Sequence, residues 1–404
     1  MFISELMPVA DVMDILSKHQ VVTDTEFIDL VDAYQRVNVE EILTLHNSPP
    51  FDKSAMDGYA IVASDSFSAS NNNPISLEIV DYIGAGSFSE KKVESGMAIG
   101  IATGAPIPEG ADAVIMKEYT IPTDNGIEIV STVSPGENIA VLGEDVKKGD
   151  LILSENTFIR SQEMAMVALS GYSKIEVYRK PKVLVINTGN ELVNPSEDLP
   201  PAKIINSNRY ALKGKVESCL ADVTLKHCVD DEDIFKNLLL ESVKEFDVII
   251  TTGGTAVSKG DVVVSMVEEL GEVLVHGIAA RPGKPFAFGM VEDTPIFMLS
   301  GYPAAAFVLF DIFVRPFIFK MQHIDYNHKL IKRISNRKIP SGLGRTDYIR
   351  AFVENGVVTP KLARGSTIIR TLMSANAYIV IEENREGVFE DETCDVLMFD
   401  SLRP

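Results

Sequence analysis

Apolar residues recur every three or four positions near the start of the chain, which is the spacing of one face of a helix. Val9, Val12 and Leu16 show this spacing, and the segment 24–34 continues in the same style. A third stretch, EMAMVAL at 163–169, has similar spacing, and two residues after it comes Gly171, a residue that often ends a helix. These three segments are predicted to be helices.

Between these helical stretches the pattern changes to short runs of β-branched residues. Runs such as ISLEIV and IEIVSTV are separated by Gly, Pro and Asn, which is typical of β-structure. We therefore predict a β-rich inserted domain, 45–141, that interrupts a helical domain made of two segments, 1–44 and 142–178.

From residue 179 to residue 322, apolar strands alternate with helical stretches. Such alternation predicts a doubly wound, mainly parallel α/β sheet with helices on both faces. The segment 323–404 has two-residue alternation in DYIRAFV and AYIVIEE, which predicts a small β-barrel or sandwich. The expected fold class is therefore multi-domain α/β plus β, with a central α/β domain at 179–322 and a C-terminal β-barrel at 323–404.

The loops of the predicted α/β domain carry residues suited to ligand binding. In DVIITTGGTAVSKGD, at 247–261, a buried strand runs into Gly253 and Gly254, and the loop ends at Asp261. Glycines let a ligand approach the backbone closely. Four more loops, NTGNEL, DDED, RPGKP and LSGYP, also follow predicted strands. Because open α/β sheets bind ligands at the carboxyl ends of their strands, we expect the five loops to form one pocket.

The composition limits the partners and the compartment. The 404 residues carry a formal net charge of −21, which argues against nucleic acid and anionic membranes because phosphate groups demand a cationic surface. No apolar run approaches the roughly 20 residues of a membrane-spanning helix, and the first residues lack the basic start of a signal peptide. A cytoplasmic protein is expected, with its 3 cysteines reduced, since they form no CxxC pair.

Common motifs for phosphate binding and hydrolysis do not occur in the sequence. GxxxxGK[ST], GxGxxG, HExxH and GxSxG are all missing. A P-loop enzyme, a nicotinamide-binding protein, a zinc hydrolase and an α/β-hydrolase are therefore not indicated.

Charged residues in the loops point to an anionic ligand. Arg281 and Lys284 flank a Pro-Gly turn and suit a phosphate or carboxylate group. Asp230 and Asp261 follow neighbouring strands, where carboxylates serve either Mg²⁺ or the N–H groups of an aminopyrimidine-type ring. Asp231 directly precedes a predicted helix, so a helix N-cap is its alternative role.

Seven motifs in the chain match one protein family in order. SPPFDKSAMDGYA at 48–60, ATGAPIPEGADAVI at 102–115 and GEDVKKGD at 143–150 are followed by NTGNEL, SNR, the glycine-pair loop and RPGKPFAFG. The chain resembles the molybdopterin molybdenumtransferases, the molybdenum insertases of cofactor synthesis, to which the matching domain of gephyrin also belongs. The resemblance extends from about Met7 to the C-terminus.

This resemblance implies a reaction and an assembly. Members of the family take adenylylated molybdopterin and molybdate, place the metal on the dithiolene sulfurs, and release AMP with the help of Mg²⁺. They are homodimers in which the site lies between the central domain of one subunit and the β-rich insert of the other. The molybdopterin adenylyltransferase and acceptor molybdoenzymes are the expected protein partners.

The resemblance also implies roles for individual residues. The residues that match active-site polar groups are Asp57, Thr103, Asp145 and Glu191. Those that match substrate contacts are Gly253, Gly254, Ser258, Asp230, Asp261, Arg281, Lys284, Ser300 and Gly301. The implied Mg²⁺ ligands are Asp261, Asp230 and Glu191. Taken alone, Asp57 has a turn residue as its alternative role, and Thr103 a local cap.

The chain departs from the family pattern in three motifs. Ala256 and Ser258 stand where GGxSxG has its serine and last glycine, Asn190 turns TGDEL into TGNEL, and Ser300 turns LPGxP into LSGYP. These changes are compatible with pterin binding and bear on turnover and on the preferred metal.

Two other functions stay open on this reasoning. A non-catalytic molybdopterin carrier or assembly scaffold would bind adenylylated molybdopterin without releasing AMP, and the changes at Ala256 and Ser300 favour it. A molybdopterin adenylyltransferase would share the central domain but would lack the β-rich insert and the C-terminal barrel.

Overall fold

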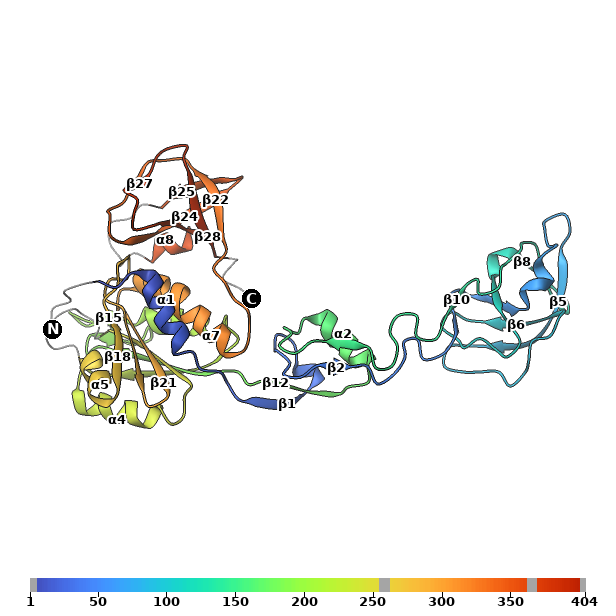
Figure 1. Cartoon of the computed structure of the whole chain (residues 1–404), viewed down its shortest axis with the longest axis horizontal. Coiled ribbons are helices and arrows are strands. Elements are labelled where there is room, and N and C mark those ends of the chain that lie inside the picture. Colours follow the sequence, from blue (N-terminus) through green and yellow to red (C-terminus); the bar gives the residue numbers. More distant parts are fainter. Residues whose placement is uncertain (1–5, 254–261, 362–368, 400–404) are drawn as a thin grey trace. The chain divides into compact units, whose positions relative to one another are not determined.

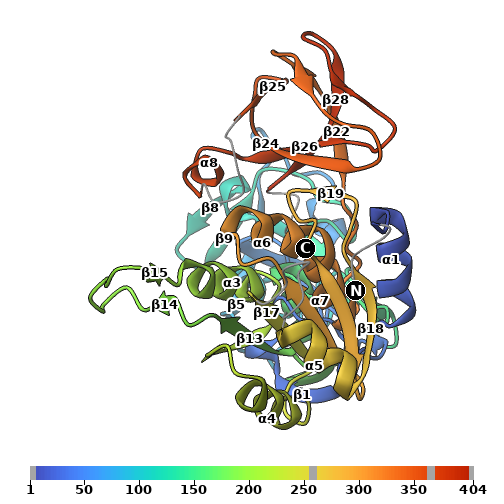
Figure 2. The ribbon, with the colours of Figure 1, turned by 90° about the vertical axis from the view of Figure 1, so that its left-hand side faces the viewer.

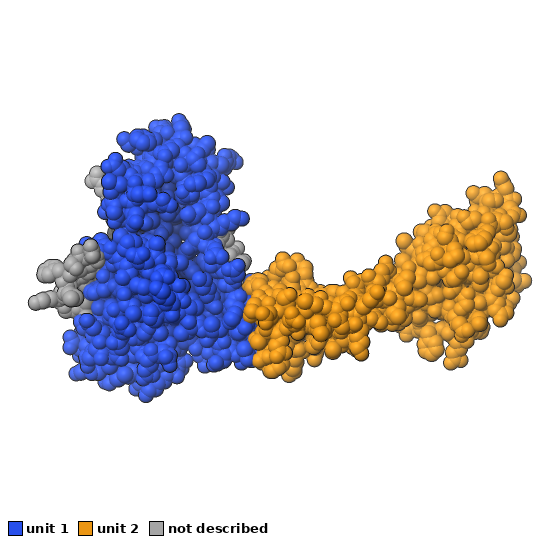
Figure 3. All heavy atoms as spheres, viewed as in Figure 1, with its two compact units in different colours: residues 1–26, 35–37, 177–404 blue, residues 27–34, 38–176 orange. Residues whose placement is uncertain are grey.

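The structure is a computed structural model that describes residues 6–253, 262–361 and 369–399. The chain divides into two compact units, which Figure 3 shows in different colours. Unit 1 contains Met1–Glu26, Gln35–Val37 and Val177–Pro404, and unit 2 contains Phe27–Tyr34 and Asn38–Glu176. Unit 2 is therefore an insertion in the sequence of unit 1.

A six-stranded sheet in the order β16-β13-β17-β21-β20-β18 forms the centre of unit 1. Its strands are β13 (Lys182–Thr188), β16 (Asp222–Cys228), β17 (Val248–Thr252), β18 (Glu272–His276), β20 (Ala287–Val291) and β21 (Thr294–Leu299). The first four strands in this order are parallel, and β20 is antiparallel to both neighbours. The predicted mainly parallel α/β domain is confirmed.

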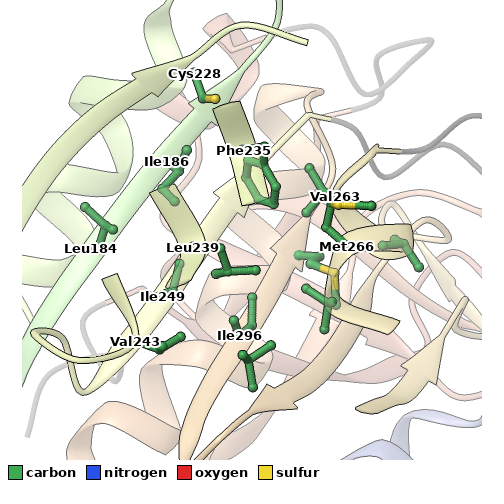
Figure 4. Close-up of a cluster of buried hydrophobic side chains, with 14 of the residues drawn as sticks. Leu184, Ile186, Cys228, Phe235, Leu239, Val243, Ile249, Val263, Met266 and Ile296 are labelled. Atoms are coloured by element: carbon green, nitrogen blue, oxygen red, sulfur yellow. The ribbon is translucent and has the colours of Figure 1, made fainter. Parts of the chain in front are cut away.

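Helices cover both faces of this sheet, as Figures 1 and 2 show. They are α1 (Val9–Lys18), α3 (Ser207–Glu217), α4 (Glu232–Ser242), α5 (Val262–Leu270), α6 (Pro303–Leu309) and α7 (Arg315–Met321). On one face, Phe235 of α4 and Met266 of α5 pack against Leu184 and Ile249 of the strands (Figure 4). Successive strand residues point to opposite faces, so the equally buried Ile250 faces the helices of the other layer. Burial on both faces explains why these strands are almost continuously apolar.

The strand register places the ends of the parallel strands at one edge of the sheet. Thr188 lies opposite Cys228, and Thr252 lies opposite Leu299, so the loops that follow these strands start side by side. The loop 277–286 lies at the same edge, because β20 is antiparallel to its neighbours β18 and β21. We call this edge the carboxyl edge. The five loops share this edge in their described residues, and their union in one pocket stays a prediction.

A closed barrel follows the α/β domain within unit 1. Its strands are β22 (Leu330–Ser335), β24 (Thr346–Glu354), β25 (Val357–Pro360), β26 (Ala377–Ile381) and β28 (Thr393–Met398). The order β24-β25-β22-β28-β26 is closed by pairing of β26 with β24. A short strand of the 277–286 loop, β19 (Ala280–Arg281), pairs with β24 and joins the barrel sheet to the carboxyl edge. The predicted C-terminal barrel is confirmed.

A buried ionic cluster lies where α3, the α6–α7 segment and the barrel meet. Asp311 sits in the π-helical turn η4 (Phe310–Val314) and is 1% exposed. Its carboxylate accepts hydrogen bonds from Lys215, Arg315 and the hydroxyl of Tyr378 in β26. Burial lowers the pKa of Lys215 even though Asp311 opposes that shift. We call these four residues the Asp311 cluster.

Unit 2 contains the predicted β-rich insert. Its six-stranded sheet has the order β7-β4-β6-β5-β9-β8. These strands are β4 (Gly58–Ile61), β5 (Ile75–Ile83), β6 (Met97–Ile101), β7 (Ala113–Met116), β8 (Thr120–Thr123) and β9 (Gly126–Ile129). Apolar side chains such as Ile61, Ile115 and Ile127 are fully buried in a hydrophobic cluster of this sheet.

One predicted helix is wrong. The segment 24–34 forms the strand β1 (Thr25–Asp29) and a 3-10 turn, η1 (Leu30–Asp32). The physical reason is that TEFID alternates between exposed and half-buried positions with a period of two, which suits a strand. The helices at the other two segments are present as α1 and α2 (Ser161–Leu169).

Short elements complete the described chain. They are β2 (Ile42–Leu43), β3 (Lys53–Ser54), η2 (Ala63–Ser66), η3 (Lys117–Tyr119), β10 (Ile139–Ala140), β11 (Leu151–Leu153), β12 (Lys174–Tyr178), β14 (Leu192–Val193), β15 (Ile204–Ile205), β23 (Ile339–Pro340), β27 (Gly387–Val388) and α8 (Arg370–Met373). Within the described ranges, no helix combines the length and apolar character needed to cross a bilayer.

Candidate functional site

Two predicted site residues of unit 2, Asp57 and Thr103, form a direct pair. Asp57 immediately precedes β4 and Thr103 follows β6, and these adjacent antiparallel strands place Gly58 opposite Ile101. The backbone N–H and the hydroxyl of Thr103 both donate to Asp57 Oδ1, each at 2.7 Å. The residues are far apart in sequence but adjacent in space, and both are exposed.

These contacts favour the ionised form of Asp57. The hydrogen bond from the Thr103 N–H, followed by that from its hydroxyl, lowers the pKa of Asp57, and the positive charge of Lys117 adds to the effect. The carboxylate is therefore ionised near neutral pH and open to a ligand. A carboxylate held in this way orients a partner but is a poor proton donor.

Asp145 lies in a loop joined to the segment that leads to Asp57. Its backbone N–H donates to the carbonyl of Ser48 at 2.9 Å, at the start of the 48–60 motif. Its own carboxylate is exposed. Among the described residues, no hydrogen bond joins that carboxylate to Asp57 or Thr103.

At the carboxyl edge of unit 1, the loops after β13 and β16 bring Asp230 against Asn190, which precedes Glu191 in sequence. The N–H of Asn190 donates to Asp230 Oδ2 at 3.1 Å, and the N–H of Asp230 donates to Asn190 Oδ1 at 3.3 Å. Glu191 folds back over Gly189, since a Cβ built there would lie 2.8 Å or less from both carboxylate oxygens. Gly189 has φ +146°, which other residues rarely adopt.

Asp231 has the role expected from its place before a helix. Its carboxylate accepts a hydrogen bond from the N–H of Ile234 at 2.9 Å and so caps α4. Asp230, the preceding residue, instead contacts Asn190 in the neighbouring loop of the carboxyl edge.

The glycine loops approach one another closely at the same edge. Gly253 has φ +92°, and a Cβ there would come within 2.5 Å of the Thr188 carbonyl. Gly301 lies close to Gly253, and its carbonyl accepts a hydrogen bond from Asn208 of the SNR motif at 2.8 Å. Ser300 is 2% exposed and its hydroxyl accepts from the N–H of Tyr302 at 3.3 Å. Gly254, Ala256, Ser258 and Asp261 lie outside the described residues.

A pocket of about 1090 Å³ opens between the carboxyl edge and the barrel. Its lining includes the five cations Arg281, Lys284, Arg345, Arg350 and Lys361. None of its described lining residues is acidic. The arrangement suits a multiply charged anion, because several donors converge on one space.

Three of these cations were not predicted from the sequence. Arg345, Arg350 and Lys361 belong to the barrel or its edges, and their place at the pocket depends on the pairing of β19 with β24. That pairing leaves no periodic signal in the sequence. Only the clustering of basic residues in GRTDYIR gave a hint.

Comparison with known proteins identifies the family. The descriptions that match are "MoeA N-terminal region (domain I and II)" at residues 7–171, "Probable molybdopterin binding domain" at 184–320, and "MoeA C-terminal region (domain IV)" at 332–399. The chain belongs to the MoeA family. The resemblance inferred from the motifs is thereby confirmed.

Relatives and solved structures of the MoeA family match nearly the whole chain. Molybdopterin molybdenumtransferase of Bacillus subtilis is 35% identical over 93% of this chain and 90% of its own length. A putative molybdopterin biosynthesis protein of Methanocaldococcus jannaschii is 39% identical, over 92% and 91%. The crystal structure of a MoeA protein from Pyrococcus horikoshii superimposes with a TM-score of 0.82 at 36% identity, covering 98% of this chain and 100% of that one.

Membership in the MoeA family confirms the enzyme prediction, since curated relatives are named as transferases. It also supports a role in molybdenum cofactor biosynthesis. The individual roles of the site residues stay predictions.

Proposed function

We propose that this MoeA-family enzyme transfers molybdenum from molybdate to the dithiolene of adenylylated molybdopterin, with Mg²⁺-dependent release of AMP. The observation that carries the proposal is the cation-lined pocket at the carboxyl edge, with no acid among its described lining residues. Molybdate and a phosphoanhydride are both multiply charged anions, and a converging set of fixed cations favours their binding.

In this proposal the residues bind and orient, and none acts as a covalent nucleophile. Arg281 and Lys284 hold an oxyanion or the phosphates. Gly253 and Gly301 leave room for the substrate against the backbone. Asp57 orients molybdate or the attacking water through its ionised carboxylate. Because the hydroxyl proton of Thr103 is directed at Asp57, Thr103 acts by holding that carboxylate in place.

The residues at the carboxyl edge fit Mg²⁺, which prefers oxygen ligands and often combines one or two carboxylates with substrate phosphates. Asp230 and Glu191 offer such oxygens on adjacent loops, and Asp261 is the third predicted ligand. Within the described part of the chain, no cluster of three or more acidic, His or Cys side chains forms a ready-made metal site. When bound, Mg²⁺ would neutralise charge on the phosphates.

We propose that the enzyme is a homodimer in the cytoplasm. Unit 2 exposes the large apolar side chains of Phe27, Val31 and Tyr34, at 74%, 78% and 55%, within one short segment. Exposed apolar surface of this kind favours association. We expect light scattering to give twice the chain mass for the wild type, and Val31→Glu to shift the protein toward the monomer. Monomeric wild-type protein at micromolar concentration contradicts the dimer.

The test of the function is release of AMP from adenylylated molybdopterin on addition of molybdate and Mg²⁺. We expect wild-type protein to release AMP, and Asp57→Ala to abolish release while the substrate still binds. Asp124→Ala, at an exposed turn of the same unit, is the matched control and should behave as wild type.

Two results of this assay would reject the proposal. Wild-type protein that binds the substrate without releasing AMP would be a carrier or scaffold. Protein that instead adds AMP to molybdopterin from ATP would be an adenylyltransferase, the alternative that the insert and the barrel argue against.

A further inference from the structure

The buried carboxylate of Asp347 lies behind the lining of the cation-lined pocket. Asp347 is 0% exposed, and the parallel pairing of β19 with β24 places it opposite Arg281 in the backbone register. Arg281 donates to Asp347 Oδ2 through Nη2. The Ser341 hydroxyl donates to the same oxygen at 2.7 Å.

The other carboxylate oxygen serves a second pocket cation. Arg345 Nε lies 3.3 Å from Asp347 Oδ1, an ion pair without a hydrogen bond. Arg281 and Arg345 are 48% and 39% exposed, so their guanidinium groups reach the pocket while Asp347 does not. One carboxylate thus restrains two of the five cations.

The charge of Asp347 is unfavourable to an anion in the pocket, because like charges repel across a poorly screened interior. Any favourable effect of Asp347 on anion binding must therefore come from the way it fixes the arginine side chains. A guanidinium is a rigid, planar set of donors, and fixing it in advance removes the entropy cost of ordering it when the ligand binds.

We propose that Asp347 is a positioning residue for the oxyanion: it holds Arg281 and Arg345 on the pocket wall, directed at molybdate. The inference rests on the proposed function, since it takes this pocket as the place where molybdate binds. It extends the site to a residue that never touches the substrate and that belongs to a different domain from Arg281.

A role of Asp347 in positioning and a role in charge balance predict opposite changes in molybdate affinity for one substitution. Asp347→Asn keeps the size of the side chain and removes its charge. If Asp347 merely balances charge, the more positive pocket binds molybdate more tightly. If it positions the arginines, molybdate binding weakens in spite of the added positive charge.

The experiment is calorimetric titration of the full chain with sodium molybdate at constant ionic strength. For Asp347→Asn we expect the Kd to rise about 10-fold, the loss of roughly one charge-assisted hydrogen bond. The double variant Asp347→Asn, Arg281→Ala should have a Kd less than about 2-fold above that of Arg281→Ala alone. The two effects are not additive, because Asp347 acts through Arg281. Asp395→Asn removes another barrel carboxylate, paired with Lys332, and should leave the Kd unchanged.

A second variant keeps the test decisive if Asp347→Asn does not fold, as judged by its thermal unfolding. Ser341→Ala leaves every charge in place but removes the hydroxyl that anchors Asp347 Oδ2, so positioning predicts weaker molybdate binding and charge balance predicts no change. If the variants bind molybdate as tightly as the wild type, or more tightly, the inference about Asp347 is wrong and the proposed function is unaffected. Wild-type protein that binds no molybdate overturns both the inference and the proposed function.

Discussion

Asn190 and Asp230 exchange hydrogen bonds between two loops of the carboxyl edge, each backbone N–H donating to the side chain of the other residue. The neutral amide of Asn190 makes this pair without placing a second negative charge beside Asp230. Asn190, which stands where the family motif has an aspartate, therefore joins the two loops. Because its amide is neutral, it makes this edge less negative for a bound cation.

The variant Asn190→Asp should bind Mg²⁺ more tightly. It retains an oxygen that can accept from the Asp230 N–H and adds a charge close to Asp230 and Glu191. An added negative charge about 4 Å from the doubly charged Mg²⁺ in a wet site is worth about 2 kcal/mol, or roughly 30-fold in affinity. The measurement is the Mg²⁺ concentration for half-maximal AMP release. Asn72→Asp, at an exposed position of the insert, is the control. If the wild type and both variants need the same Mg²⁺ concentration, Asp230 and Glu191 are not part of the metal site.

The acid limb of the pH–rate profile should depend on Thr103. The folded protein lowers the pKa of Asp57 from its ordinary 3.8, so the ionised form is favoured by folding. This stabilisation is present above pH 3.8 and is lost as the pH falls through the lower folded pKa. Thr103→Val removes the hydroxyl donor and should move the acid limb of kcat/KM to higher pH, whereas Thr103→Ser should not. An identical limb in both variants would show that Asp57 does not control the rate.

Gly253 and Gly301 should respond differently to the same substitution. Gly253→Ala forces φ +92° on a residue with a Cβ and brings that atom within 2.5 Å of the Thr188 carbonyl, so we expect a loss of more than about 1 kcal/mol in the free energy of unfolding. A Cβ at Gly301 would meet its nearest atom at 3.5 Å, an ordinary contact. Chemical denaturation compares the two variants, and equal stabilities would contradict the assigned geometry.

Removal of the carboxylate from the Asp311 cluster should destabilise unit 1 strongly. Asp311→Ala leaves Lys215 and Arg315 buried without their shared anion, and breaking a buried ion pair typically costs about 3–5 kcal/mol. The midpoint of urea unfolding should therefore fall well below that of the wild type. Asp198→Ala, at an exposed loop position, should change stability by less than about 0.5 kcal/mol. A midpoint that stays unchanged in Asp311→Ala would show that the cluster does not hold the barrel to the α/β domain.

The sequence predicted those features that depend on local pattern. The strands of the α/β sheet, the glycines at their ends and the N-cap at Asp231 all follow from residue type and spacing. The pair of Asp57 and Thr103 could be anticipated only through the family motif, because the residues come together by pairing of two strands. Asp347 and Arg345 were missed because their importance depends on burial and on the pairing of β19 with β24. The helix expected at 24–34 was wrong because a period of two and a period of 3.6 are hard to tell apart over so few residues.

The order in which the chain leaves the ribosome follows from the position of unit 2 as an insertion. Residues 27–176 are almost entirely within unit 2, so this unit is synthesised whole before the first strand of the central sheet appears. Met7, by contrast, exchanges backbone hydrogen bonds with Gly277 and Ala279. At about 5–20 residues per second, the N-terminal segment spends roughly ten seconds to a minute without its partners. During that interval the apolar face of α1 is open to chaperones and to other nascent chains.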